Sequence, residues 1–259
     1  MEVSYFSKTL DMQSSMGVIL PQKNNDYGVP IKKGVSAPFP VLYFLHGRGG
    51  DHSVMRRFQK LELYAQIYGV VIVMPDAHQS FYTDQLHGSP YITFLAEELP
   101  GIVSEFFHVS TARKDTYAAG ISMGGYGALK LALSRPGIFS AGASLSGAVD
   151  VAEICEAQEK NGVTEAFDVM GEASKVRGSN NDLFALCENF DFAGKTAPRL
   201  FMCCGTEDML YWQNVRMRNH IKGLPFDLTY EEEPGTHNWA YWDMKIQSVL
   251  KWLNIGGEA

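Results

Sequence analysis

The sequence predicts an α/β fold in which a mostly parallel central sheet of about eight strands is flanked by helices. Two observations support this prediction. Short apolar runs alternate with longer helix-like segments along the chain. Several runs, such as 41–45 and 70–74, are continuously apolar, as expected for strands that helices cover on both faces. A chain of 259 residues is long enough for such a fold, and we expect a single domain over 1–259.

The first two predicted strands, 3–6 and 16–20, lie close together with no helix between them, so we expect them to be antiparallel. The polar segment 22–38 is predicted to be a loop. Further strands are predicted at 41–45, 70–74, 116–119, 141–145, 200–204 and 226–230. Helices are expected near 53–68, 91–107, 125–134, 209–223 and 239–253, with Pro100 interrupting the second of them.

The gap between the strands at 141–145 and 200–204 is too long for a simple crossover. Residues 149–195 are polar and carry helical patches such as 151–160. We therefore expect a helical insertion that leaves the main sheet. It is either part of a lid or cap over a site or a surface insertion with no role, and the sequence favours neither.

The composition excludes some classes of partner. The net charge of −7 argues against nucleic acid, because neutralising phosphates requires a basic face. The four cysteines, Cys155, Cys187, Cys203 and Cys204, lack zinc-site spacing and are interpreted as reduced thiols. The start of the chain lacks a signal-peptide pattern, and no apolar run approaches the roughly 18 residues of a membrane span. We therefore expect a cytoplasmic protein without a membrane partner.

Residues 120–124 match the pattern Gly-x-Ser-x-Gly around Ser122. In this pattern the serine occupies a strained strand-to-helix turn, and flanking glycines leave room for neighbouring backbone. The five residues alone are weak evidence, but a predicted strand at 116–119 leads into them and a small-residue helix start follows. Ser122 is therefore a candidate nucleophile; the alternative is a glycine-rich turn without chemistry.

Acyl transfer needs two backbone N–H groups aimed at the oxygen that becomes negative. One is expected from Met123, directly after the serine, and the other from Gly47 or Arg48, in the glycine-rich loop after strand 41–45. We interpret His46 as a structural residue at the strand end rather than as a base. The Arg48 side chain either binds an acidic substrate group or is solvated, and the sequence does not decide.

The acid and the base of a Ser-acid-His triad are expected downstream of the serine in this class of fold. Glu207 and Asp208 both follow the predicted strand 200–204, so either could be the acid. His237 lies on a loop after strand 226–230, whereas His220 falls inside a predicted helix. In the resulting mechanism His237 takes the proton of Ser122 and the carboxylate fixes the imidazole. This chemistry requires no metal and no organic cofactor.

With these residues placed, the chain resembles the esterase D family of α/β-hydrolases, from residue 3 to residue 253. The most specific segments are Leu-His-Gly-Arg-Gly-Gly at 45–50, Gly-Ile-Ser-Met-Gly-Gly-Tyr-Gly-Ala at 120–128, Cys-Gly-Thr-Glu-Asp at 204–208 and Gly-Thr-His-Asn-Trp at 235–239. The resemblance implies the α/β-hydrolase fold and a serine carboxylic-ester hydrolase, with Asp208 as the triad acid. Residues 75–82 resemble the tributyrin-esterase branch and are expected in the pocket wall.

The resembling group also includes feruloyl and acetyl-xylan esterases, S-formylglutathione hydrolases and exported mycolyltransferases. S-formylglutathione hydrolases usually carry a cysteine in the loop that is 48–51 here, and this chain has none there. The resemblance therefore favours small-molecule esters with acetyl, butyryl or cinnamoyl groups, and segments 78–92 and 149–195 are expected to set acyl length. A thioesterase or acyltransferase with the same triad is the first alternative, and a catalytically dead binding protein is the second. Such enzymes often self-associate, which leaves a homo-oligomer open.

Overall fold

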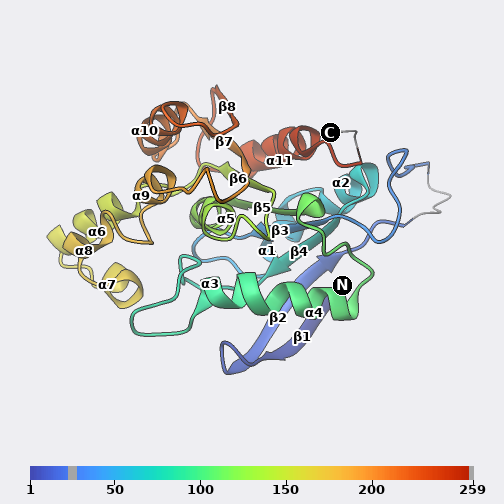
Figure 1. The fold of residues 1–259 in the computed structure, drawn as a ribbon, viewed down its shortest axis with the longest axis horizontal. Helices are drawn as coiled ribbons and strands as arrows, with labels where there is room; N and C mark the ends of the chain where they lie inside the picture. The colour runs from blue at the N-terminus through green and yellow to red at the C-terminus, as the bar shows by residue number, and fades with distance from the viewer. Residues whose placement is uncertain (23–27, 257–259) are drawn as a thin grey trace.

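The computed structural model of the chain describes residues 1–22 and 28–256, and its centre is an eight-stranded sheet (Figure 1). The strand order is β1-β2-β4-β3-β5-β6-β7-β8. The strands are β1 (Glu2–Ser7), β2 (Met12–Ile19), β3 (Val41–Leu45), β4 (Val71–Pro75), β5 (Thr116–Ile121), β6 (Ala141–Leu145), β7 (Arg199–Gly205) and β8 (Leu228–Glu233). β1 pairs antiparallel with β2, and β2 with β4, while the pairs from β4 to β8 are parallel. The predicted fold class and the antiparallel start are confirmed.

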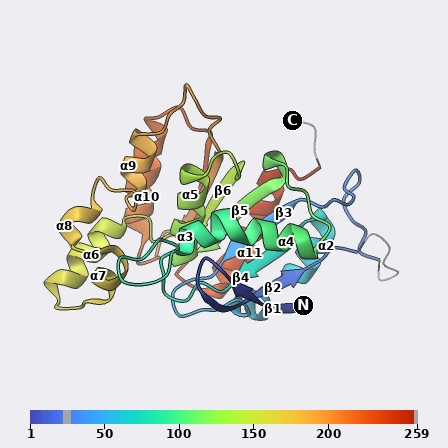
Figure 2. The same cartoon turned by 60° about the horizontal axis from the view of Figure 1, so that its bottom comes forward.

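Helices cover both faces of the sheet, which explains the continuous apolar runs. Successive residues of a strand point to opposite faces. In β3, Tyr43 belongs to one core cluster, whereas Leu42 and Phe44 belong to the other. The first cluster includes buried residues of α4 (Leu99–Phe106) and α5 (Met123–Ser134); the second includes those of α2 (Leu61–Tyr68) and α11 (Trp239–Leu253). Figure 2 shows α4 in front of the sheet and α11 behind it.

Two of the expected helices are divided. The segment 53–68 forms α1 (Val54–Phe58) and α2, and the segment 91–107 forms α3 (Tyr91–Thr93), a π-helical turn (Phe94–Glu98) and α4. Pro100 is the second residue of α4, so the expected interruption is confirmed. Proline has no N–H, and its ring would clash with the carbonyl four residues earlier, which a widened turn avoids. The remaining large helix, α10 (Tyr211–Lys222), lies within its expected range.

The last strand lies further along the chain than the sequence predicted. It was expected at 226–230, but β8 runs from Leu228 to Glu233 and contains three successive glutamates. β8 is at an edge of the sheet, where side chains reach solvent and cations. Lys245 of α11 pairs with Glu231 and Glu233, and Arg218 of α10 pairs with Glu232 at 3.1 Å. The ion pairs, rather than apolar burial, accommodate this end of the strand.

The insertion at 149–195 is helical, as expected. It contains α6 (Val151–Lys160), α7 (Glu165–Met170), α8 (Ala173–Val176) and α9 (Leu183–Glu188). Both views show α6, α7 and α8 gathered at one end of the molecule, away from α2 (Figures 1 and 2). Asp150, at the start of α6, accepts hydrogen bonds from Arg216 of α10 at 3.2 Å and from Arg177 at 3.4 Å. In the two described ranges, no helix is long and apolar enough to cross a membrane.

Gly124 lets α5 approach β3 closely. A Cβ atom at this position would lie 2.1 Å from the carbonyl oxygen of Leu45 and 2.7 Å from that of His46. Both neighbours are backbone atoms, so neither can move away by changing a rotamer. The contact fixes the helix that carries the serine against the strand that leads to the glycine-rich loop.

We expect Gly124→Ala to lower the free energy of unfolding by about 1–3 kcal/mol or more, since overpacking against backbone forces a shift of the helix. Urea denaturation measures this change. Gly101→Ala is the matched control, because Gly101 lies in α4 with no atom within 4 Å of the added Cβ. There alanine should stabilise by up to about 1 kcal/mol through its higher helix propensity. Equal stability of the two variants would contradict the close contact.

Candidate active site

The structure brings Ser122, His237 and Asp208 into one hydrogen-bonded line. Each residue follows the carboxyl end of a parallel strand, namely β5, β8 and β7 respectively. His237 Nε2 lies 3.0 Å from Ser122 Oγ, and His237 Nδ1 lies 2.9 Å and 3.0 Å from the two carboxylate oxygens of Asp208. Residues separated by up to 115 positions in the chain thus meet at one edge of the sheet.

Ser122 occupies the sharp turn between β5 and α5 that its motif predicted. Its backbone has φ +53° and ψ −117°, a combination that residues other than glycine rarely adopt. The turn is held by bonds from Gly125 N–H to the Ser122 carbonyl at 2.9 Å and from Ser122 N–H to the Leu145 carbonyl at 3.0 Å. A Cβ on Gly120 would lie 2.2 Å from the Gly124 carbonyl oxygen, so the first glycine of the motif is required by space.

The Asp208 carboxylate is buried and remains an acceptor. Burial alone would raise the pKa of Asp208, but hydrogen bonds from His237 and from the Leu210 N–H outweigh it and hold that pKa below its ordinary value. An ionised carboxylate can only accept, so His237 Nδ1 carries the proton that faces it. Nε2 is then unprotonated in neutral imidazole and accepts from the Ser122 hydroxyl.

Glu207, the other candidate acid, points elsewhere. Its Oε2 accepts a hydrogen bond of 2.6 Å from Gly235 N–H, and its own N–H donates to the Gly235 carbonyl at 3.0 Å. These bonds fasten the loop that carries His237 to the end of β7. The two neighbouring acids therefore have separate contacts: Asp208 holds the imidazole, and Glu207 holds the loop. His220 lies in α10, with its Nε2 3.2 Å from the Phe184 carbonyl oxygen.

His46 orients the glycine-rich loop, because both of its ring nitrogens face backbone groups. Its Nε2 faces the Ala77 N–H at 3.1 Å, which can only donate, so Nδ1 carries the ring proton and donates to the Gly47 carbonyl at 2.8 Å. Burial lowers the pKa of His46 and favours this neutral form. In a trans peptide the C=O and N–H point in opposite directions. Holding the Gly47 carbonyl therefore turns the Arg48 N–H the other way.

The other two expected contributors of N–H groups also lie around the serine. Met123 is the first residue of α5, so its N–H has no partner within the helix. Gly47 lies beside the nucleophile, since a Cβ atom added to it would lie 3.4 Å from the Cβ of Ser122. The Arg48 side chain donates from Nε to Gln79 Oε1 at 3.1 Å, which joins the 75–82 segment to this loop.

A cleft of about 340 Å³ opens beside Ser122 and has an aromatic wall. Phe58 and Trp239 stack with ring centroids 4.9 Å apart, and the Trp242 ring stands edge-on to His237 at the same separation. The lining residues are Gly47, Arg48, Gly49, Gly50, Val54, Phe58, Ile121, Ser122, His237, Trp239 and Trp242.

The sequence did not predict this wall. We expected 75–82, 78–92 and 149–195 to shape the pocket, but no described residue of these segments lines the cleft. The expectation was wrong for this cleft because its wall is built by α1 and by the start of α11. The first helix follows the glycine-rich loop in the chain, and the second follows the loop that carries His237. One residue of the Gly-Thr-His-Asn-Trp segment could have indicated the aromatic wall, namely Trp239, which follows His237 by two positions.

Comparisons with known proteins identify the family of this chain. The Esterase family model matches residues 7–253. The acetyl esterase of Caldicellulosiruptor saccharolyticus is 27% identical, over 98% of this chain and 97% of that enzyme. Two structures from Staphylococcus aureus are each 27% identical. The fluorophosphonate-binding serine hydrolase FphF superposes with a TM-score of 0.87, covering 100% of this chain and 98% of its own. The S-formylglutathione hydrolase FrmB gives 0.83, covering 98% and 97%. The chain therefore belongs to the Esterase family, as an esterase D-like carboxylic-ester hydrolase with the α/β-hydrolase fold.

Proposed function

We propose that this protein hydrolyses short-chain acyl esters of small molecules through an acyl-enzyme on Ser122. The observation that carries the proposal is the line Asp208–His237–Ser122, with hydrogen-bond distances of 2.9 Å and 3.0 Å. A serine hydroxyl is a weak nucleophile unless a base accepts its proton. An imidazole held in the correct tautomer by a buried carboxylate supplies that base.

In the proposed mechanism, His237 Nε2 removes the proton of Ser122 as Oγ attacks the ester carbonyl. The imidazolium that forms is stabilised by Asp208 and then gives its proton to the departing alcohol oxygen. Water next attacks the acyl-enzyme as the same imidazole takes its proton. The imidazolium then returns that proton to Ser122 Oγ as the acid product leaves. The chain itself supplies every proton transfer in this cycle.

The oxyanion of the tetrahedral intermediate would be held by the N–H groups of Met123 and Arg48. Met123 N–H lies at the start of α5, where the helix dipole also favours negative charge. The sequence left Gly47 and Arg48 open for the second donor. We favour the Arg48 N–H, because the bond from His46 fixes the Gly47 carbonyl and thereby the direction of the next N–H.

The size of the cleft supports a short acyl group. Its volume of about 340 Å³ is at the small end of ligand pockets, which span roughly 300–1,000 Å³. The acetyl esterase homologue supports an acetyl group. The stacked rings of Phe58 and Trp239 also offer a flat apolar surface for an aromatic group such as cinnamoyl.

A panel of p-nitrophenyl esters tests the substrate proposal. We expect kcat/KM to be highest for acetate and butyrate and to fall by about ten-fold or more for octanoate, because a long chain would leave the cleft and lose burial. A fluorophosphonate is expected to label Ser122, as read by mass spectrometry of peptides. A preference for octanoate would overturn the short-chain proposal, and a label on another residue would overturn the nucleophile.

Thioester hydrolysis is the second candidate, favoured by the similarity to S-formylglutathione hydrolase FrmB. The same triad serves both reactions, because only the leaving atom changes. Comparing kcat/KM for S-formylglutathione and p-nitrophenyl acetate separates them. A thioester preference of about ten-fold or more would replace the ester proposal, while product analysis with added alcohols would detect acyl transfer.

A further inference from the structure

A second cavity, of about 510 Å³, lies apart from the cleft beside Ser122. It is bounded by the second half of α5, by α9 and by the segments just before α3 and before α9. The two cavities share no lining residue. This one is lined by Thr83, Asp84, Ile92, Lys130, Leu133, Ser134, Arg135, Gly178, Ser179, Asn180, Asn181, Ala185, Leu186, Asn189, Phe190, Asp191 and Lys195.

Lys130 forms a cationic part of the cavity wall and is only 3% exposed. Its Nζ donates to Thr83 Oγ1 and, at 2.6 Å, to Asn181 Oδ1. Both acceptors are neutral, and an ammonium group has three N–H donors. Across the described ranges, no carboxylate lies within 4.0 Å of Nζ. The charge is therefore buried without an ion-pair partner. Nζ lies 5.6 Å from the centroid of the Tyr126 ring, and among the described residues its third N–H has no oxygen acceptor.

A buried unpaired ammonium is unfavourable, so the group either loses its proton or is joined by an anion. Burial lowers the pKa of Lys130 to about 7, and Asp84 opposes that shift only in part. The Asp84 carboxylate is already used, since its oxygens accept from the N–H of Thr93 at 3.1 Å and from the Thr93 hydroxyl at 2.8 Å. The cavity wall thus presents the cation of Lys130, while the carboxylate of Asp84 is already hydrogen-bonded to Thr93.

Other groups around the cavity suit an anion with several oxygens. Arg135 and the exposed Lys195 add two positive charges to the lining, and Arg135 also pairs with Glu97, outside the lining, at 3.1 Å. The second acid of the lining, Asp191, accepts from the Gly194 N–H at 2.9 Å. Side chains of Ser134, Asn180 and Asn189 add neutral hydrogen-bonding groups. The lining therefore carries three cations against two acids, each of which has a local donor, while Glu97 balances part of the charge of Arg135.

We propose that this cavity binds a small oxyanion, either a carboxylate or a tetrahedral phosphate-type group, through the ammonium of Lys130. The anion accepts the third N–H of Lys130 Nζ, while Arg135 and Lys195 contribute attraction from the rim. The inference does not depend on the proposed ester hydrolysis, because no residue of the serine cleft takes part.

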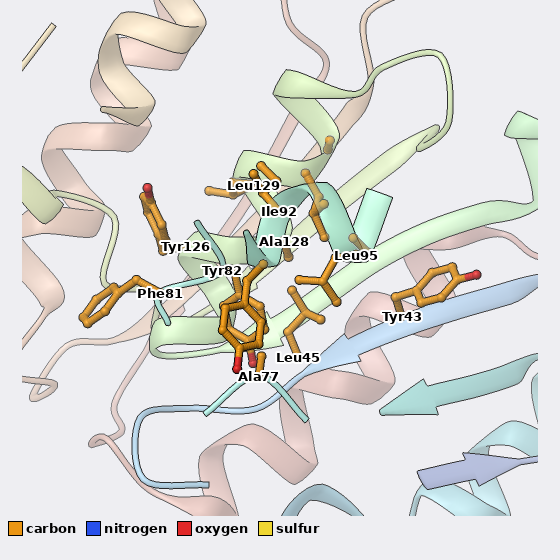
Figure 3. Packing of buried hydrophobic residues seen from close by; sticks show 14 of the residues in the cluster. Tyr43, Leu45, Ala77, Phe81, Tyr82, Ile92, Leu95, Tyr126, Ala128 and Leu129 are labelled. Atoms are coloured by element: carbon orange, nitrogen blue, oxygen red, sulfur yellow. The ribbon is translucent and has the colours of Figure 1, made fainter. Parts of the chain in front are cut away.

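Two tyrosines connect the surroundings of this cavity to other parts of the fold, one to the glycine-rich loop after β3 and the other to the insertion. Tyr82, next to Thr83, donates its hydroxyl to the His46 carbonyl at 2.7 Å. Figure 3 shows Tyr82 beside Ala77 and Leu45, at the end of β3. Tyr126, one turn before Lys130 in α5, donates to the Asn181 carbonyl at 2.8 Å. Lys130 thus bonds to Thr83, which is next to the tyrosine that holds His46, and to Asn181, whose carbonyl Tyr126 holds.

Isothermal titration calorimetry with sodium sulfate and with sodium acetate, at pH 6 and fixed ionic strength, tests the proposal. The full-length chain is used untreated and after treatment with a fluorophosphonate, which blocks the serine cleft. We expect one saturable site in both samples. Affinity should fall by about ten-fold or more in Lys130→Met, because a charge-assisted hydrogen bond is lost. Lys222→Gln is the matched control, since Lys222 is an exposed lysine at the end of α10.

The pH dependence gives a second readout. Sulfate does not titrate between pH 6 and pH 9, whereas Lys130 loses its proton as the pH rises through about 7. The groups that face Nζ are Thr83 and Asp84 before α3, Asn181 before α9, and Tyr126 and Arg135 at either end of its helix. Sulfate affinity should therefore weaken by about ten-fold or more from pH 6 to pH 9.

The outcomes separate the ligand types and can reject the site. Saturable binding of sulfate alone indicates a tetrahedral anion, and binding of acetate alone indicates a carboxylate. No saturable binding, or equal affinity in Lys130→Met, overturns the proposal. If Lys130→Met does not fold, the double variant Arg135→Gln/Lys195→Gln replaces it, with about three-fold weaker binding expected. Unchanged affinity in that variant together with no pH dependence overturns the site as well.

Discussion

Ser122→Ala is expected to lower kcat by a factor of about 10⁴ or more while leaving the free energy of unfolding almost unchanged. The substitution removes the one atom that forms the acyl bond. It keeps the backbone turn, because both residues carry a Cβ atom and the bonds that hold the turn come from backbone atoms. Residual activity above the rate in water would come from the backbone donors and from substrate positioning.

Steady-state kinetics with p-nitrophenyl acetate and urea denaturation measure the two effects separately. Fluorophosphonate labelling should disappear in the same variant. Ser104→Ala is the control, because the Ser104 hydroxyl bonds only to the Gly101 carbonyl within α4. Near-normal turnover by Ser122→Ala would reject the nucleophile, and a large loss of stability would show that the hydroxyl has a structural role instead.

Asp208→Asn is expected to lower kcat by a factor on the order of 10³–10⁴. The asparagine amide can donate to His237 Nδ1, which would place the ring proton on Nε2. That nitrogen could then no longer accept from Ser122 Oγ. Glu207→Gln, next in the chain, should lower kcat by less than about ten-fold, since Glu207 bonds to the Gly235 N–H of the loop and not to His237. The opposite ranking of the two variants would assign the acid to Glu207.

The effect of Asp208→Asn on the free energy of unfolding should depend on pH. The pKa of Asp208 is lower in the folded chain than its ordinary value near 3.9. A lowered carboxyl pKa stabilises the folded state above that ordinary value, and the contribution is lost as the pH falls through the folded pKa. The difference in unfolding free energy between the parent chain and Asp208→Asn should therefore shrink below about pH 4. A difference that stays constant from pH 7 to pH 2 would contradict the favourable charge on Asp208.

The central strands and the order of the site residues could be predicted because they leave local patterns. Strands such as β3 and β4 are buried on both faces and are apolar throughout, and Gly-x-Ser-x-Gly has a steric requirement that Gly120 and Gly124 meet. The choice between Glu207 and Asp208 came from family resemblance, because both follow the same strand. Only the structure shows that one reaches His237 and the other reaches Gly235.

Features that depend on contacts between distant segments could not be read from the sequence. The rings of Phe58 and Trp239 are 181 positions apart by residue number, and their stacking depends on how α1 and α11 meet. The role of Lys130 likewise depends on Thr83 and Asn181, which lie in two separate loops. Strand β8 was misplaced because its carboxylates are stabilised by Lys245 and Arg218, and no apolar period marks such a strand.

The three glutamates of β8 have a consequence for contacts between molecules. An open edge of a sheet carries N–H and C=O groups that can pair with a second copy and start β-type aggregation. If two β8 strands met, successive carboxylates would be brought against one another, and like charges opposing across strands are destabilising. The three carboxylates pair with only two cations, Lys245 and Arg218, so this edge keeps a net negative charge that disfavours edge-to-edge joining and protects one side of the sheet from uncontrolled growth.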